Sequence, residues 1–174
     1  ISVGLIPFDL HRIYCRQSYY WLIKPQKPLT EDSVVIHGIR HTDLSSAPDL
    51  EVILEDILEI LKGKIAVVHY RTIERGFLNQ ALMNRIGEGI LFPLIDTMTL
   101  ESKIASHFYS GFIKKMFARK KRESLRLAAC RARYGLPMYT PHHALIDAIA
   151  TAELFQAQLT HHFLPSDPIK KFWC

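Results

Sequence analysis

With 174 residues, 48% of them hydrophobic and 22% charged, the chain has the length and balance of one soluble globular domain with its own core. No apolar run approaches the length needed to cross a bilayer, and the first ten residues lack the basic start and the cleavage-type ending of a signal peptide. The net charge of +5 favours a polyanionic partner only weakly.

The cysteines and the first residue bear on the cellular setting. Cys15, Cys130 and Cys174 are odd in number and far apart, so they predict neither a disulfide framework nor a metal knuckle. We therefore expect a reducing, cytoplasmic location. The chain begins at Ile1, without a methionine and already inside a predicted strand. We expect its natural beginning to be absent from this sequence.

The N-terminal half predicts two strands, a loop and a helix. Residues 1–10 and 12–25 are rich in branched and aromatic side chains and predict strands joined by a short polar turn. A loop is expected over 30–48. Apolar residues then recur at helical spacing across 49–63, and Gly63 marks the end of that helix.

The C-terminal half predicts alternating strands and helices. The apolar stretches 65–70 and 90–98 have the composition of buried strands, and 72–86 between them predicts a helix. Two more helices are expected over 100–134 and 140–159, separated by a glycine and a proline. Two strands followed by alternating helices and strands predict an α/β fold with a mixed β-sheet flanked by helices.

Two adjacent histidines and one acid stand out in PHHALIDAIATAEL, residues 141–154. Asp147 lies in a mostly apolar helix, where a buried carboxylate must be paired, hydrogen-bonded or bound to a metal, although a solvent-facing position is equally open. Residues four apart share a helix face, so geometry favours His143 as its partner. His142 is five residues away and would point about 140° away on an ideal helix.

Other polar residues follow predicted strands. Glu74 lies just beyond the strand at 65–70, at the edge where α/β sheets place their sites, or it is a first-turn acid favoured by the helix dipole. Asp96 is either a ligand or a helix N-cap, and we favour the cap. The basic run KKMFARKKR at 114–122 is a solvated helix face or a phosphate contact. The sequence contains no phosphate-binding glycine loop and no GxSxG nucleophile elbow.

Four stretches, taken together, resemble the DEDDh 3'-5' exonucleases, a family that includes the proofreading epsilon subunits of bacterial DNA polymerase III. They are IHGI at 36–39, HYRTIERGFL at 69–78, IDT at 95–97 and HHALIDAIATAEL at 142–154. The match covers nearly the whole chain in the right order. It implies a ribonuclease H-like fold and removal of nucleotides from 3' ends with two divalent metal ions, Mg²⁺ or Mn²⁺.

The resemblance also implies roles for eight residues. His142, rather than His143, becomes the base that takes the proton of the attacking water, because Ala144 and Asp147 then match the family pattern. Asp147 and Glu74 become metal ligands. The expected contacts with the terminal nucleotide are His37, Ile36, His69, Tyr70 and Ile73.

Two departures from the family pattern affect the expected chemistry. The first motif, Asp-x-Glu on the central first strand of the sheet, is absent, and residues 1–9 resemble the strand that normally follows it. Asp147 and Glu74 offer two negative charges to ions that carry four positive ones, so we expect poor metal affinity in this chain. Glu74 stands where the family usually has aspartate, which indicates weaker activity or a preference for manganese.

The sequence therefore predicts one N-terminally incomplete exonuclease-like domain over 1–174. The expected activity is 3'-5' hydrolysis of single-stranded or frayed DNA in proofreading or repair, with RNA as a further substrate and a polymerase as a further partner. The alternative is a catalytically silent module that binds nucleic acid or protein, and an Asp-x-Glu upstream of Ile1 would favour the enzyme.

The start of the last helix bears on the choice of histidine. If the helix begins near Ala144, His142 lies in the preceding loop and is free of helical spacing. Thr140 and Pro141 argue for an earlier start, since they look like a cap followed by a first-position proline.

Overall fold

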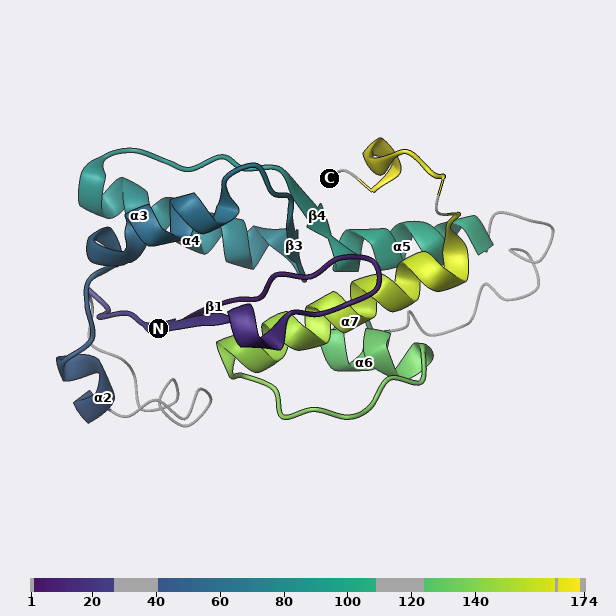
Figure 1. Cartoon of the computed structure of the whole chain (residues 1–174), viewed down its shortest axis with the longest axis horizontal. Coiled ribbons are helices and arrows are strands. Elements are labelled where there is room, and N and C mark those ends of the chain that lie inside the picture. Colours follow the sequence, from purple (N-terminus) through teal and green to yellow (C-terminus); the bar gives the residue numbers. More distant parts are fainter. Residues whose placement is uncertain (1, 27–40, 109–123, 165, 173–174) are drawn as a thin grey trace.

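The computed structural model describes residues 2–26, 41–108, 124–164 and 166–172, which form a mixed fold of helices and two small sheets (Figure 1). The predicted α/β class is confirmed. The elements in chain order are β1 (Ser2–Leu5), η1 (Cys15–Gln17), β2 (Tyr19–Leu22), α2 (His41–Ser45), α3 (Leu50–Leu61), β3 (Ala66–Val68), α4 (Arg71–Ile86), β4 (Leu94–Asp96), α5 (Thr97–Phe108), α6 (Leu127–Arg133), α7 (Ala144–His162) and η3 (Ile169–Lys171).

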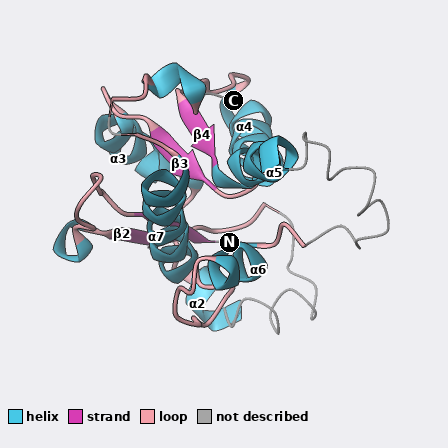
Figure 2. Cartoon of the chain, turned by 90° about the vertical axis from the view of Figure 1, so that its right-hand side faces the viewer, coloured by secondary structure: helices cyan, strands magenta, loops and turns pink. Residues whose placement is uncertain are grey.

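The strands run in mixed directions, as predicted, but they form two separate pairs in the described part of the chain. β1 and β2 are antiparallel, with Gly4 opposite Tyr20. β3 and β4 are parallel, with Val67 opposite Ile95. The long helix α7 contacts both β1 and β3 and so holds the two pairs in one fold (Figures 1 and 2).

Two hydrophobic clusters form the core. The first lies where α3 and α4 pack together, and its buried members are Ile23, Leu50, Ile53, Ile57, Leu82 and Ile90. The second joins β4, α5, α7 and the C-terminal η3, and its buried members are Ile95, Leu100, Phe155 and Phe172. Burial of these large apolar side chains is the main stabilising contribution to such a fold.

The predicted strand at 12–25 is wrong over its first half, because the chain turns there instead. The Asp9 carboxylate accepts hydrogen bonds from two backbone N–H groups of the turn and from the Tyr14 hydroxyl. Residues Cys15–Gln17 then form a 3-10 turn. Within 12–25, the four residues of β2 form a strand, and Ile13 makes an isolated antiparallel bridge with Phe8.

The single helix predicted over 100–134 is also wrong. The backbone is not helical just before α6, where the Leu125 carbonyl accepts hydrogen bonds from the His69 ring and the Cys130 thiol. The basic run at 114–122 lies outside the described residues. By contrast, α3 and α4 match the predicted helices 49–63 and 72–86 within two residues at each end.

Two further expectations concern membrane-spanning helices and the state of the cysteines. In the described ranges, no helix is both long enough and apolar enough to span a membrane. Cys15 and Cys130 carry free thiols. Cys174 lies outside the described residues.

An ion pair between α3 and α4 makes part of the stability pH dependent. Arg85, whose side chain is 6% exposed, donates from Nε to Asp49 Oδ1 at 2.5 Å. This bond, more than any other contact, lowers the pKa of Asp49 below its ordinary value of 3.8. A lowered carboxyl pKa stabilises the fold above the ordinary pKa, and the contribution is lost as the pH falls through the folded-state value.

We therefore expect Asp49→Asn to reduce the free energy of unfolding near neutral pH and to reduce it progressively less as the pH falls below about 4. Urea unfolding of both proteins between about pH 7 and pH 3 measures this difference. A difference that stays constant with pH would contradict the assignment.

Candidate functional site

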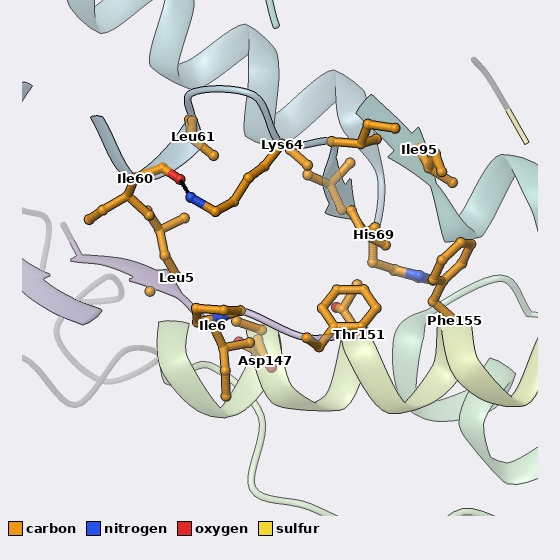
Figure 3. A pocket seen from close by; sticks show the side chains of 18 of the residues that line it. Leu5, Ile6, Ile60, Leu61, Lys64, His69, Ile95, Asp147, Thr151 and Phe155 are labelled. Atoms are coloured by element: carbon orange, nitrogen blue, oxygen red, sulfur yellow. Dashed lines mark hydrogen bonds between the residues drawn. The ribbon is translucent and has the colours of Figure 1, made fainter. Parts of the chain in front are cut away.

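A cavity of about 1500 Å³ lies between the two strand pairs. β1 lines one side and β3 the other, while α7 contributes Asp147 and Thr151 from below (Figure 3). Lys64 reaches toward this space and donates to the Ile60 carbonyl at 2.6 Å. Most of the lining is apolar, and the polar side chains include those of His69 and His142.

The cavity has unpaired backbone on both sides. β1 pairs only with β2, and β3 pairs only with β4, so each has one edge without a strand partner in the described part of the chain. Backbone N–H and C=O groups away from water are nearly always hydrogen-bonded in native proteins. The cavity thus lies between two strands that each have one strand partner among the described residues.

The start of α7 decides how the two histidines lie. α7 begins at Ala144 with His143 as its N-cap residue, so the start predicted near 140 is wrong. A Cβ atom on Gly4 would lie 2.6 Å from backbone atoms of Ala144 and Leu145. β1 thus closely approaches the first turn of α7. This contact joins residues far apart in the chain, so it cannot be predicted from the residues around α7 alone.

His142 lies in the loop before α7 and lines the cavity. Its φ of 74° is in the left-handed region, which costs a non-glycine residue about 1–2 kcal/mol. Its backbone N–H donates to Asp147 Oδ2 at 3.1 Å. The structure thus brings together His142 and Asp147, the pair that the family pattern predicts.

His143 contacts the N-terminal hairpin. Its ring stacks on Tyr20, with 4.7 Å between ring centroids and 13° between the planes. Tyr20 is paired with Gly4, so the stack and the close backbone approach lie on the same side of the N-terminal hairpin. His143 is not among the residues that line the cavity.

The Asp147 carboxylate is half-buried at one end of the cavity. Burial raises its pKa, while the hydrogen bonds from the His142 N–H and the Tyr139 hydroxyl act in the opposite direction. Burial, together with the Asp147 charge, raises the pKa of Tyr139 to about 12. A carboxyl group with a raised pKa at a polar point of a large cavity is a functional-site candidate.

His69 lines the cavity, but both of its ring nitrogens have partners. Nδ1 lies 2.8 Å from Thr97 Oγ1, and Nε2 lies 2.9 Å from the Leu125 carbonyl. A carbonyl only accepts, so Nε2 carries a proton. Burial lowers the pKa of the ring. His69 is therefore held in place by contacts at both ring nitrogens.

Tyr70 is 41% exposed and is not among the residues that line the cavity. It caps α4 with a φ of 78°, again in the left-handed region.

Asp96, which is 2% exposed, accepts hydrogen bonds from the Tyr70 and Arg71 N–H groups as well as from Met98 and Thr99 in α5. The favoured capping role of Asp96 is confirmed, and its second role at α4 is new.

The remaining predicted site residues cannot be placed in the cavity. Ile36 and His37 lie outside the described residues. Ile73 and Glu74 belong to the first turn of α4, and their side chains also lie outside the described set. In the residues that the structure describes, no group of three or more histidine, cysteine, aspartate or glutamate side chains is arranged to hold a metal ion. These residues alone do not make up a two-metal site.

Two residues near the site were not predicted from the sequence. Arg131 of α6 is buried against the loop before α7, and its guanidinium lies 5.1 Å from the ring centroid of Tyr139. An arginine in a basic helix and a tyrosine in a loop have no pattern that would single them out. Their contacts depend on how α6, α7 and the loop pack together.

Comparisons with known proteins place the chain in one family of exonucleases. The model of a family described as RNase_T, Exonuclease, matches residues 1–155. DNA polymerase III subunit epsilon of Haemophilus influenzae is 23% identical over 155 residues, which cover 89% of this chain and 56% of that protein. DNA polymerase III PolC-type of Thermotoga petrophila is 28% identical over 155 residues, covering 89% of this chain and 10% of that protein.

Solved structures show the same fold. Cell-death related nuclease 4 superposes with a TM-score of 0.72 at 18% identity and covers 93% of this chain and 57% of its own. The nuclease domain of 3'hExo, a DEDDh family member solved with rAMP, has a TM-score of 0.70 at 12% identity, over 93% and 81% of the two chains. The expected ribonuclease H-like fold is confirmed. The chain spans just over half the length of the epsilon relative.

Proposed function

Because the chain belongs to the RNase_T exonuclease family, we propose that it is part of a metal-dependent 3'-5' exonuclease of the DEDDh type. The proposed substrates are 3' ends of single-stranded or frayed DNA, in proofreading or repair. The observation that carries the proposal is the pairing of His142 with Asp147 at one end of the cavity. The epsilon subunits among the relatives support the assignment to DNA.

In this proposal each site residue has the role expected from the family pattern. His142 accepts a proton from the water that attacks the terminal phosphodiester. Asp147 and Glu74 are ligands for Mg²⁺ or Mn²⁺, ions that would supply positive charge for the phosphoryl oxygens. The proposed contacts with the terminal nucleotide are His37, Ile36, His69, Tyr70 and Ile73.

The proposal also requires the two acids of the family's first motif, Asp-x-Glu, which the sequence does not contain at the expected place. We propose that a central strand carrying Asp-x-Glu fills the space between β1 and β3 and pairs with both. Support comes from the free edges of these two strands and from the apolar cavity between them. Asp147 lines the same cavity, so carboxylates on that strand would join it there.

The complete protein should shorten a 5'-labelled single-stranded oligonucleotide from its 3' end, one nucleotide at a time, only when Mg²⁺ or Mn²⁺ is present. Calorimetric titration with Mn²⁺ should show tight binding to the complete protein and weak binding to residues 1–174. Gel analysis of the labelled products gives the polarity. The absence of metal-dependent loss of 3' nucleotides would overturn the proposal.

A second candidate is a catalytically silent module that binds nucleic acid or protein. It is favoured by one observation, the lack of a metal-holding group in the described part of the chain. Binding of an oligonucleotide without hydrolysis by the complete protein would identify it. An RNA substrate, a polymerase partner and a cytoplasmic location remain predictions.

A further inference from the structure

Arg131 of α6 is a charged side chain buried between α7 and the loop that precedes it. Its Nη1 donates to the Ala150 carbonyl and pairs with Glu153 Oε2, both at 2.7 Å. Its Nη2 donates to the Pro137 carbonyl at 3.0 Å. The guanidinium therefore joins the middle of α7 to the first part of the loop.

Tyr139 continues this connection as far as Asp147. The Arg131 guanidinium lies over the Tyr139 ring, at a distance typical of a cation–π contact. The Tyr139 hydroxyl and the Asp147 carboxylate interact electrostatically, and each affects the pKa of the other. Three residues further along, the His142 N–H donates to the same carboxylate. The loop is thus held to Asp147 by the His142 N–H and to Arg131 at Pro137 and Tyr139.

The chemistry of Arg131 suits a holding role. A buried guanidinium is unfavourable unless its donors are paired, and here Nη1 and Nη2 reach carbonyls on two different elements, while the buried Nε has no hydrogen-bond partner among the described residues. The rigid fork of arginine fixes the direction of both bonds, which the single ammonium group of lysine does not reproduce. The left-handed backbone at His142 persists only if surrounding contacts hold it. The described contacts of this loop include the bond from Arg131 to Pro137, the cation–π contact of Arg131 with Tyr139, and the bond from His142 to Asp147.

We propose that Arg131 and Tyr139 are positioning residues that set the place of the His142 imidazole relative to the Asp147 carboxylate without touching substrate. This inference rests on the proposed exonuclease function. It adds two residues to the site that lie in α6 and in the loop, away from the stretches that carry the family pattern.

α6 also contains a matched pair of controls. Arg133 bonds Glu101 of α5 at 2.9 Å, and the Tyr134 hydroxyl donates to the same carboxylate at 2.9 Å. The variants Tyr139→Phe and Tyr134→Phe each remove one hydroxyl that interacts with a carboxylate. Likewise, Arg131→Lys and Arg133→Lys each replace one guanidinium that pairs with a glutamate. Only the first member of each pair contacts the His142 loop.

In the complete protein, Tyr139→Phe and Arg131→Lys should lower kcat by roughly 10- to 100-fold, with KM for a single-stranded oligonucleotide little changed. Each control should lower the unfolding midpoint, because it also loses a polar contact with a carboxylate, and leave kcat near the wild-type value. Equal kcat losses in a variant and its control would show that stability alone is responsible and would overturn the proposal.

The amide signal of His142 in ¹H–¹⁵N NMR spectra provides a readout that does not need activity. Because this N–H donates to Asp147, its chemical shift should move in Tyr139→Phe and Arg131→Lys and stay unchanged in both controls. If the complete protein proves inactive, the proposed function fails, while the amide signal still decides the positioning role. An unmoved His142 signal in both site variants would overturn that role.

Discussion

Replacing His142 by alanine in the complete protein should lower kcat by about 10²- to 10⁴-fold, the range for loss of a general base. His142 lies in the loop before α7, lines the cavity, and is tied through its backbone to Asp147. The substitution leaves the backbone N–H in place, so the hydrogen bond to Asp147 should survive. The fold should therefore be retained while hydrolysis is lost.

His143→Phe is the matched control for this prediction. The ring of His143 stacks on Tyr20, and phenylalanine preserves a flat aromatic surface for that contact. We expect kcat within about threefold of wild type, because His143 neither lines the cavity nor needs to exchange a proton there. Steady-state kinetics on a labelled oligonucleotide measures both variants. Loss of hydrolysis in His143→Phe with retention in His142→Ala would show that simple helix spacing identified the base.

Asp96→Ala should reduce the free energy of unfolding by about 3 kcal/mol or more, since a buried donor left unpaired costs about 1–3 kcal/mol. Each Asp96 oxygen bonds the starts of two helices. Oδ1 accepts from Tyr70 and Met98 at 2.9 and 3.0 Å. Oδ2 accepts from Arg71 and Thr99 at 3.3 and 2.9 Å. Alanine removes all four bonds and leaves the left-handed turn at Tyr70 unsupported.

Asp96→Asn tests whether both carboxylate oxygens of Asp96 are needed as hydrogen-bond acceptors. An amide keeps one acceptor oxygen and turns an NH₂ group toward two of the donors, so we expect a loss close to that of alanine. Urea unfolding measures both variants, and a constant m-value would confirm that the fold unfolds as one unit. A loss below about 1 kcal/mol for Asp96→Ala would mean that water replaces the carboxylate at these donors.

Local sequence patterns predicted the elements that depend on local interactions. The periodicity of 49–63 and 72–86 led to α3 and α4, because the apolar face of a helix repeats within a few residues. Asp96 was recognised as a cap because its N–H partner in α5 is two residues away. The same reasoning failed for the start of α7, which begins at Ala144, where Gly4 of β1 closely approaches the helix backbone.

The residue patterns were enough to predict the α/β class, and the resemblance of four motifs to the DEDDh exonucleases was enough to predict the family. The three-dimensional packing was needed to show that α7 begins at Ala144, that Asp96 accepts a bond from Tyr70, 26 residues earlier, and that Arg131 bonds the loop before α7. It was also needed to show that β1 and β3 line one cavity. These features join residues distant along the chain, so they arise only when packing brings their donors, acceptors and strand edges together.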